Sequence, residues 1–271
     1  MGERIGWMDD VYHMLEDVFH FSWNAHLHAL NEHLRLRPEH RFSTHGPSEP
    51  PTFFNGDIEA LQPGRWILVV SLNPHQVKQP VDRHFATFAE YWNFWRTYNC
   101  KTWYPGFYRP LTRVAAGAMR IELSLEDERT FATTQMLFLE LCPYASPRFD
   151  LAPERVKELV AGDPGFRIAR RILQLAAGEG HPALILVNGN AAVESLSAVE
   201  GGRIEWSKDA RYPSESKQGK RLHHREGSYE TALGSVPVAG FPFLHTRQGH
   251  NSYVEIAQLA SHLHALISPT G

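Results

Sequence analysis

Four apolar stretches of this sequence end abruptly in polar side chains that can form hydrogen bonds or transfer protons. Their carboxamides, carboxylate, imidazoles and guanidinium belong to Asn73, His75, Glu140, Asn188, Asn190, His245, Arg247, Gln248, His250 and Asn251. Ligands of open α/β sheets bind outside the carboxyl ends of the strands, so we expect these groups to converge on one site. Such groups can orient a water molecule and stabilise charge that develops on a leaving group.

The four apolar stretches have the composition of buried strands. They cover residues 66–72, 134–142, 183–187 and 236–244; the first is apolar on both faces, and Glu140 lies within the second. This pattern is typical of parallel strands that are covered by helices on both sides.

Helices are predicted between and around these strands. We expect them at residues 8–36, 85–98, 110–119, 153–178 and 252–267, with a break near residue 162, a further helix after residue 190 and an aromatic loop at 99–110. The alternation of strands and helices predicts a three-layer α/β/α sandwich with a central, mostly parallel four-stranded sheet.

The length of 271 residues is compatible with a single domain spanning 1–271. We expect an N-terminal helical extension over about 1–50 and a polar, basic insertion over about 203–232. This insertion could form a hairpin or a disordered excursion. Its most basic part, residues 217–225, could follow a DNA backbone or be a solvated loop.

Composition excludes several classes of protein. The net charge of −3 argues against a uniformly basic DNA-binding protein but leaves room for a local basic groove. Two cysteines, Cys100 and Cys142, cannot form a four-cysteine zinc or iron–sulfur site. An amphipathic N-terminus and the lack of an apolar stretch of about 18 residues predict a cytoplasmic protein without a membrane partner.

The sequence has 16 histidines but suggests neither a metal nor a cofactor. The N-terminal histidines, such as His26, His28 and His33, lack the i, i+4 spacing of a helical metal pair, so we expect them on helix surfaces. The chain also lacks the GxSxG, GxxxxGK[ST], GxGxxG and HExxH motifs, which argues against common hydrolases, nucleotide-binding folds and zinc proteases.

The order of the strand-end motifs resembles that of the uracil-DNA glycosylase superfamily. The matching segments are SLNP at 71–74, LFLE at 137–140, NGNAA at 188–192 and LHTRQGHNS at 244–252. The Asn73-Pro74 pair resembles the first motif of the mismatch-specific and single-strand-selective branches, which have an asparagine where the main branch has an aspartate. Ser71 replaces the usual glycine of the first motif, and the fourth motif lacks its proline and serine.

The resemblance implies a monofunctional glycosylase that flips a base out of DNA and hydrolyses its N-glycosidic bond. Asn73 would hold the attacking water, and His245 would donate a hydrogen bond to the base carbonyl. The DNA would be contacted by Ser146, Asn190, Arg247, Gln248, His250 and Asn251. In the simpler interpretation, Asn73 starts a turn, His245 is an ordinary polar strand end, and the residues after it form a solvated loop.

Glu140 carries the most information about the substrate. Uracil-specific members have an asparagine at this position, whereas an ionised glutamate offers only acceptors. The exocyclic amine of cytosine is a donor, so Glu140 indicates a cytosine-type base or a protonated glutamate in an apolar pocket. The alternative is a structural role for Glu140.

The base pocket implied by the resemblance also contains Pro74, His75, Phe85 and Phe88. We expect Phe88 to stack on the flipped base, with Tyr104, Phe107 and Tyr108 as rivals, although aromatic stripes of this kind are more often part of a core. His75 stands where the main branch has a bulky tyrosine, which leaves room for a modified base.

The sequence therefore predicts a monomeric DNA glycosylase without a cofactor. Its expected substrate is a modified cytosine, for example a hydroxymethylated or glucosylated one as in phage DNA, which suggests antiviral defence. The alternatives are a uracil or mismatch repair glycosylase, a non-catalytic DNA-binding module on the same fold, and a nucleoside hydrolase-like enzyme.

Overall fold

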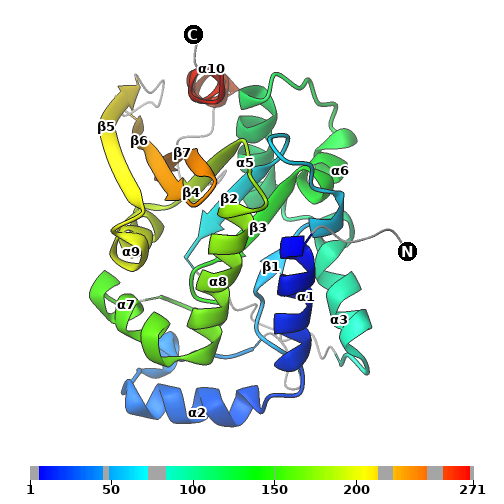
Figure 1. Ribbon diagram of the computed structural model, residues 1–271, viewed down its shortest axis with the longest axis vertical. Coiled ribbons are helices and arrows are strands. Elements are labelled where there is room, and N and C mark those ends of the chain that lie inside the picture. Colours follow the sequence, from blue (N-terminus) through cyan, green and yellow to red (C-terminus); the bar gives the residue numbers. More distant parts are fainter. Residues whose placement is uncertain are drawn as a thin grey trace.

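A mixed sheet forms the centre of the protein in the computed structural model (Figure 1). The structure describes residues 6–44, 49–72, 84–149, 151–212, 222–242 and 253–268. Within them, the sheet has seven strands in the order β1-β3-β2-β4-β7-β6-β5. They are β1 (Phe54–Asn55), β2 (Ile67–Ser71), β3 (Met136–Glu140), β4 (Leu184–Asn188), β5 (Ile204–Tyr212), β6 (Leu222–Thr231) and β7 (Gly234–Phe241).

The four predicted strands form the parallel centre of this sheet, β3-β2-β4-β7. The expectation of a four-stranded sheet is wrong, because three antiparallel strands extend it. Strand β1 pairs with β3. With only two residues, β1 is too short to leave a periodic pattern in the sequence. At the other edge, β5 and β6 form a hairpin that pairs with β7, and this hairpin is the insertion expected at 203–232.

The predicted helices occur in their predicted order with different boundaries, and the helix at Asp127–Thr134 was not predicted. The helices are α1 (Gly6–Asp17), α2 (Trp23–His33), α3 (Phe88–Arg96), α4 (Tyr98–Lys101), α5 (Pro105–Ala118), α6 (Asp127–Thr134), α7 (Pro153–Gly162), α8 (Pro164–Gly178), α9 (Asn190–Glu200) and α10 (Tyr253–Ile267), with short 3₁₀ turns at Pro38–His40 and Ile58–Ala60. The single helix predicted at 8–36 is two helices. The predicted aromatic loop at 99–110 is largely helical, because Pro105 occupies the first turn of α5, where its missing N–H is not needed.

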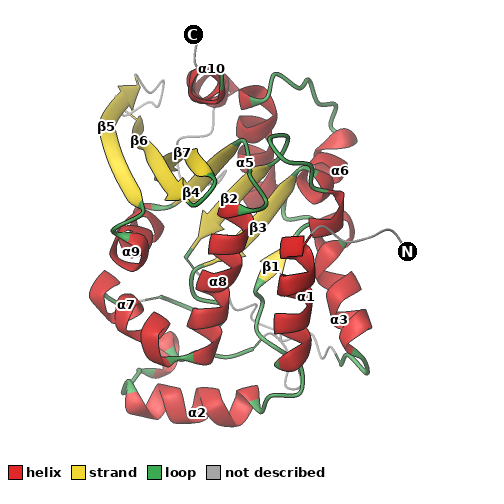
Figure 2. Ribbon diagram, viewed as in Figure 1, coloured by secondary structure: helices red, strands yellow, loops and turns green. Residues whose placement is uncertain are grey.

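Helical layers cover both faces of the sheet, as predicted (Figure 2). Alternate strand residues point to opposite faces, so Leu68 and Val70 belong to one apolar core and Ile67 and Val69 to the other. The first core is closed by α1, α2, α3, α7, α8 and α9, and the second by α5, α6 and α10. No helix in the described ranges is long and apolar enough to cross a membrane.

A buried carboxylate joins the N-terminal helices to this framework. Asp163 caps α8 by accepting a hydrogen bond from the backbone N–H of Phe166, which explains the predicted break between α7 and α8. Asp163 also accepts a hydrogen bond of 2.6 Å from the Tyr144 hydroxyl and lies 2.7 Å from His26 of α2. The network therefore fixes the segment after β3, which contains Tyr144, against α2 and α8.

Replacing this carboxylate is expected to destabilise the fold. Asp163→Ala removes a helix cap and leaves the buried Tyr144 hydroxyl without its acceptor, so the free energy of unfolding should fall by about 2–4 kcal/mol. Urea denaturation measures this change. His28→Ala on the exposed side of α2 is the control and should change stability little; an equally stable Asp163→Ala variant would contradict the structural role.

Candidate functional site

Three polar side chains form a row across the carboxyl edge of the parallel strands. Ser71, the last residue of β2, pairs with Glu140, the last residue of β3. Val70 pairs with Val187, so Asn188 at the end of β4 is the next neighbour of Ser71. The sheet register therefore brings together Glu140, Ser71 and Asn188, which we call the polar row.

The polar row faces the layer that contains α5, α6 and α10. The residues two positions earlier on the three strands, Phe138, Val69 and Leu186, all belong to the apolar core on that side. Because side chains alternate along a strand, the polar row extends this apolar surface at its carboxyl edge. Ser71 and Asn188 are 5% and 2% exposed, so the row is largely shielded from water.

Glu140 is the ionisable member of the row, and burial changes its chemistry. The residue as a whole is partly exposed, but its Oε2 atom is buried and has no hydrogen-bond partner among the described residues. Burial raises the pKa of Glu140 to about 8, because a charged carboxylate is poorly solvated there. At neutral pH the carboxyl group therefore holds its proton and presents one donor and one acceptor.

Two other buried carboxylates in the described part of the chain, those of Glu128 and Glu200, are hydrogen-bonded, unlike Oε2 of Glu140. Glu128 receives hydrogen bonds from Arg109 and Arg113 at 2.7 and 2.8 Å. Glu200 is bonded to Arg170 and to the Tyr229 hydroxyl. These residues fix helices and strands to one another, whereas Glu140 has no such partner among the described residues.

The Ser71 hydroxyl resembles Glu140 in this respect. Its oxygen is buried without a hydrogen-bond partner in the described ranges. A buried polar group left without a partner costs about 1–3 kcal/mol, so two such groups side by side require an explanation. A polar ligand that enters the carboxyl edge of the sheet would supply the missing hydrogen bonds.

An aromatic wall from α5 borders the same side of the sheet. Tyr108 packs its ring edge-on against Phe138 with 5.1 Å between centroids, and its ring stacks on Trp103 at 5.4 Å. Burial is the main reason why the pKa of Tyr108 is raised, and the charge of Glu140 contributes to the same shift. Tyr108 and Phe107 are thus the aromatic residues that the structure brings towards Glu140.

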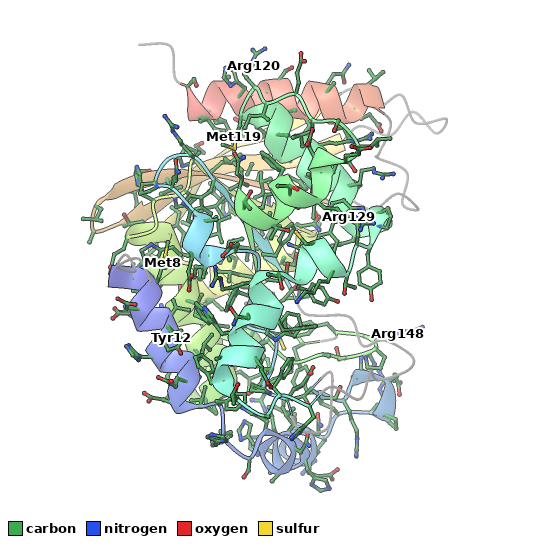
Figure 3. All side chains as sticks on the ribbon, turned by 90° about the vertical axis from the view of Figure 1, so that its right-hand side faces the viewer. Met8, Tyr12, Met119, Arg120, Arg129 and Arg148 are labelled. Carbon is green, nitrogen blue, oxygen red and sulfur yellow. The ribbon has the colours of Figure 1, made fainter. Side chains whose placement is uncertain are left out.

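Phe88, the aromatic residue favoured by the sequence, belongs to the opposite layer. Its ring contacts Tyr12 of α1 at 4.8 Å and Phe19 at 5.7 Å, within the other apolar core. Tyr12, which contacts Phe88, lies on the left of the molecule in Figure 3. Arg129, which lies over the Trp103 ring beside Tyr108, is on the right. The structure therefore does not bring Phe88 together with Glu140.

Phe85 also packs in the opposite layer, against Tyr91 and Phe94. Helical periodicity identifies a buried aromatic face on α3 but cannot show which side of the sheet it covers.

Two of the proposed DNA contacts, Asn190 and Ser146, have different settings. Asn190 is exposed at the start of α9, and helix N-termini suit anions, whereas Ser146 is buried.

The turn before Asn190 depends on glycine. Gly189 has a φ of 111° and connects the end of β4 to the first turn of α9. This backbone conformation is strained for residues with a Cβ atom, so the glycine lets α9 begin directly at the carboxyl edge.

The remaining predicted site residues lie outside the described residues. They are Asn73, Pro74, His75, His245, Arg247, Gln248, His250 and Asn251. In the sequence, the first three follow β2 after one intervening residue, and the others come after the end of β7. Their proposed roles thus still depend on the sequence.

No family model and no curated protein matches this chain. The chemistry available at the polar row therefore follows from its own residues: a protonated carboxyl, a hydroxyl and a carboxamide beside an aromatic wall. The residue type of Glu140 marks it as a candidate in the sequence, whereas Ser71 stands out there only as a departure from a motif. The alternation of side chains along each strand was the signal that could have grouped Ser71 with Glu140.

A possible metal-ligand set lies on the neighbouring antiparallel hairpin and α10. It consists of His224, Glu226 and His262, whose ligand atoms lie within 4.8 Å of one another. This set is separate from the polar row.

The raised pKa of Glu140 predicts a specific dependence of stability on pH. The unfolded carboxyl loses its proton near pH 4.5, whereas the folded one keeps it to about 8. The stability that comes from this proton is fully present below about pH 4.5 and is lost as pH rises through 8. The free energy of unfolding of the wild-type protein should therefore fall by roughly a few kcal/mol between about pH 4.5 and 8.

The neutral variant Glu140→Gln removes this titration. Its stability relative to the wild type should therefore increase from pH 5 to pH 9, as measured by urea denaturation at several pH values. Glu122→Gln changes an exposed carboxyl and serves as the matched control. Parallel pH curves for wild type and Glu140→Gln would show that the buried carboxyl does not titrate in this way.

Proposed function

We propose that the protein is a monofunctional DNA glycosylase that excises a modified cytosine and leaves an abasic site. The observation that carries this proposal is the polar row, in which Glu140 lies beside Ser71 and Asn188 at the carboxyl edge of a parallel sheet and burial raises the pKa of its carboxyl group. The resemblance of the ordered sequence motifs to uracil-DNA glycosylases supports it.

A protonated Glu140 matches the hydrogen-bonding edge of cytosine. Its O–H group can donate to N3 of the base, while its second oxygen accepts from the exocyclic amine. An ionised glutamate could not donate to N3. The same carboxyl group can serve uracil with its two oxygens in exchanged roles, so the uracil or mismatch repair activity is the alternative.

The proton of Glu140 also helps the base to leave. When the bond between C1′ and N1 breaks, the electron pair stays on the base and spreads to N3 and O2. Transfer of the Glu140 proton to N3 then releases a neutral base, which is general acid catalysis. A water oxygen forms the new bond to C1′, and the proton that the water loses passes to solvent, from which Glu140 is reprotonated.

The sequence motifs supply the other roles in this proposal. Asn73 holds the water, His245 donates to the base carbonyl, and water rather than an amine is the nucleophile because the motifs contain no lysine at these positions. Phe107, which is half-buried beside Tyr108, offers an aromatic surface for the flipped base. With a net charge of −3, DNA would be held by a local groove, to which Asn190 and Arg247 contribute.

Hydroxymethylated and glucosylated cytosines occur in phage DNA, so defence against such phages is the role that we propose. Within this proposal the protein acts as a monomer in the cytoplasm. A repair function would instead require uracil or a mismatched base as substrate.

Base release from DNA provides the direct test. Purified protein is incubated with genomic DNAs that contain uracil, unmodified cytosine, or hydroxymethylated or glucosylated cytosine, and the released base is identified by mass spectrometry. We expect a modified cytosine and abasic DNA, with the product lost in Asn73→Ala and His245→Ala although DNA binding remains. Release of uracil alone would establish the repair alternative, and DNA binding without any base release would indicate a non-catalytic module.

The acid role of Glu140 predicts the pH profile of this reaction. The protonated form predominates below about pH 8, so the single-turnover rate of base release should fall as pH rises through 8. Glu140→Gln keeps a donor and an acceptor but has no proton to transfer. Its rate of base release should therefore fall by about 100-fold or more and should not decrease further as pH rises through 8. Equal rates for Glu140→Gln and wild type at pH 7 would contradict the acid role; Glu122→Gln is the control.

A further inference from the structure

Two histidines and a glutamate converge between the edge hairpin and α10. His224 and Glu226 are two residues apart on β6 and therefore point to the same face of the sheet. Nε2 of His224 lies 2.5 Å from Oε1 of Glu226, and Nε2 of His262 on α10 contacts the same oxygen. The two imidazole rings are 5.1 Å apart and nearly perpendicular.

The burial of this His–Glu–His cluster leaves one side accessible. The side chain of His224 is fully buried and that of Glu226 is 7% exposed, whereas that of His262 is 27% exposed. A cation could therefore enter beside His262, and water could complete its coordination.

We propose that His224, Glu226 and His262 bind one divalent transition-metal ion, with Zn²⁺ as the expected ion. Two neutral imidazoles and a carboxylate form a known zinc ligand set, which leaves a fourth position for water. Mg²⁺ and Ca²⁺ prefer oxygen ligands, so the two nitrogens argue against them. The one carboxylate balances part of the charge of the ion within a largely buried site.

The geometry requires only a small adjustment. Ligand atoms at about 2.0–2.1 Å from a tetrahedral Zn²⁺ are roughly 3.3 Å apart. The 2.5 Å between His224 and Glu226 must therefore widen by roughly 1 Å, which a rotation of the glutamate side chain can provide. All three ligand atoms already lie within 4.8 Å of one another.

The position of the cluster indicates what the metal would do. Arg225 pairs with Gly240, so His224 lies beside Phe241 at the carboxyl edge of β7. Phe241 in turn pairs with Asn188 of the polar row. Adjacent strands are about 4.8 Å apart, so the cluster and Asn188 are separated by roughly 10 Å. The ion would join the β5–β6 hairpin to α10 next to the proposed DNA-binding edge, and this inference does not depend on the glycosylase proposal.

Direct metal binding tests the proposal on the full-length protein. The protein is freed of metal by a chelator and titrated with Zn²⁺ in competition with a chromogenic chelator; native mass spectrometry gives the stoichiometry of the protein as purified. We expect one Zn²⁺ per chain with a Kd below about 1 μM and a rise in Tm on binding. Failure of the wild-type protein to bind Zn²⁺ in this range would overturn the proposal.

Variants locate the bound ion. Replacing a residue that only supports a metal ligand commonly weakens metal binding 10- to 100-fold. His262→Ala and Glu226→Gln remove ligands themselves, so they should weaken Zn²⁺ binding by about 100-fold or more. His264→Ala is the matched control, because this half-buried histidine lies on the same helix and contacts the carbonyl of Ala118 instead. Unchanged affinity in the ligand variants would show that any bound zinc lies elsewhere, which also overturns the assignment.

Discussion

The pleat of the parallel strands is the constraint on which the candidate site depends. Because side chains alternate along each strand, the in-register ends of β2, β3 and β4 present Ser71, Glu140 and Asn188 on one face. A shift of one residue in any strand would turn its polar end towards the opposite core. The two apolar cores hold this register, since each takes every second residue of the buried strands.

The fold was predictable where both faces of a segment are buried. Continuous apolar runs and the Gly-Asp-Pro-Gly sequence at 162–165 are local signals, so the sequence predicts the parallel strands and the break at Asp163. The polar sequence of β5 and β6 is compatible with strands or a loop, so it does not decide between a hairpin and a disordered segment. Pro105 and Gly106 are typical of a loop, so the sequence does not predict the first turns of α5.

The site was predictable in residue type but not in arrangement. Glu140 was identified because a carboxyl group within an apolar strand is unusual, yet its protonation depends on burial that only the fold creates. The choice between Phe88 and Tyr108 required knowledge of which helix covers which face of the sheet. His262 is far from Glu226 in the sequence, so no local spacing could reveal their contact.

The order of the strands has a consequence for how the chain folds. Strand β3 lies between β1 and β2, although both precede it in the sequence, and β4 closes the other side of β2. During synthesis, β2 therefore has no neighbour on either side until β3 and β4 have emerged, whereas β5, β6 and β7 pair through short-range contacts. Non-local pairing is slow because long loops must close first, so assembly of the central strands should limit the folding rate.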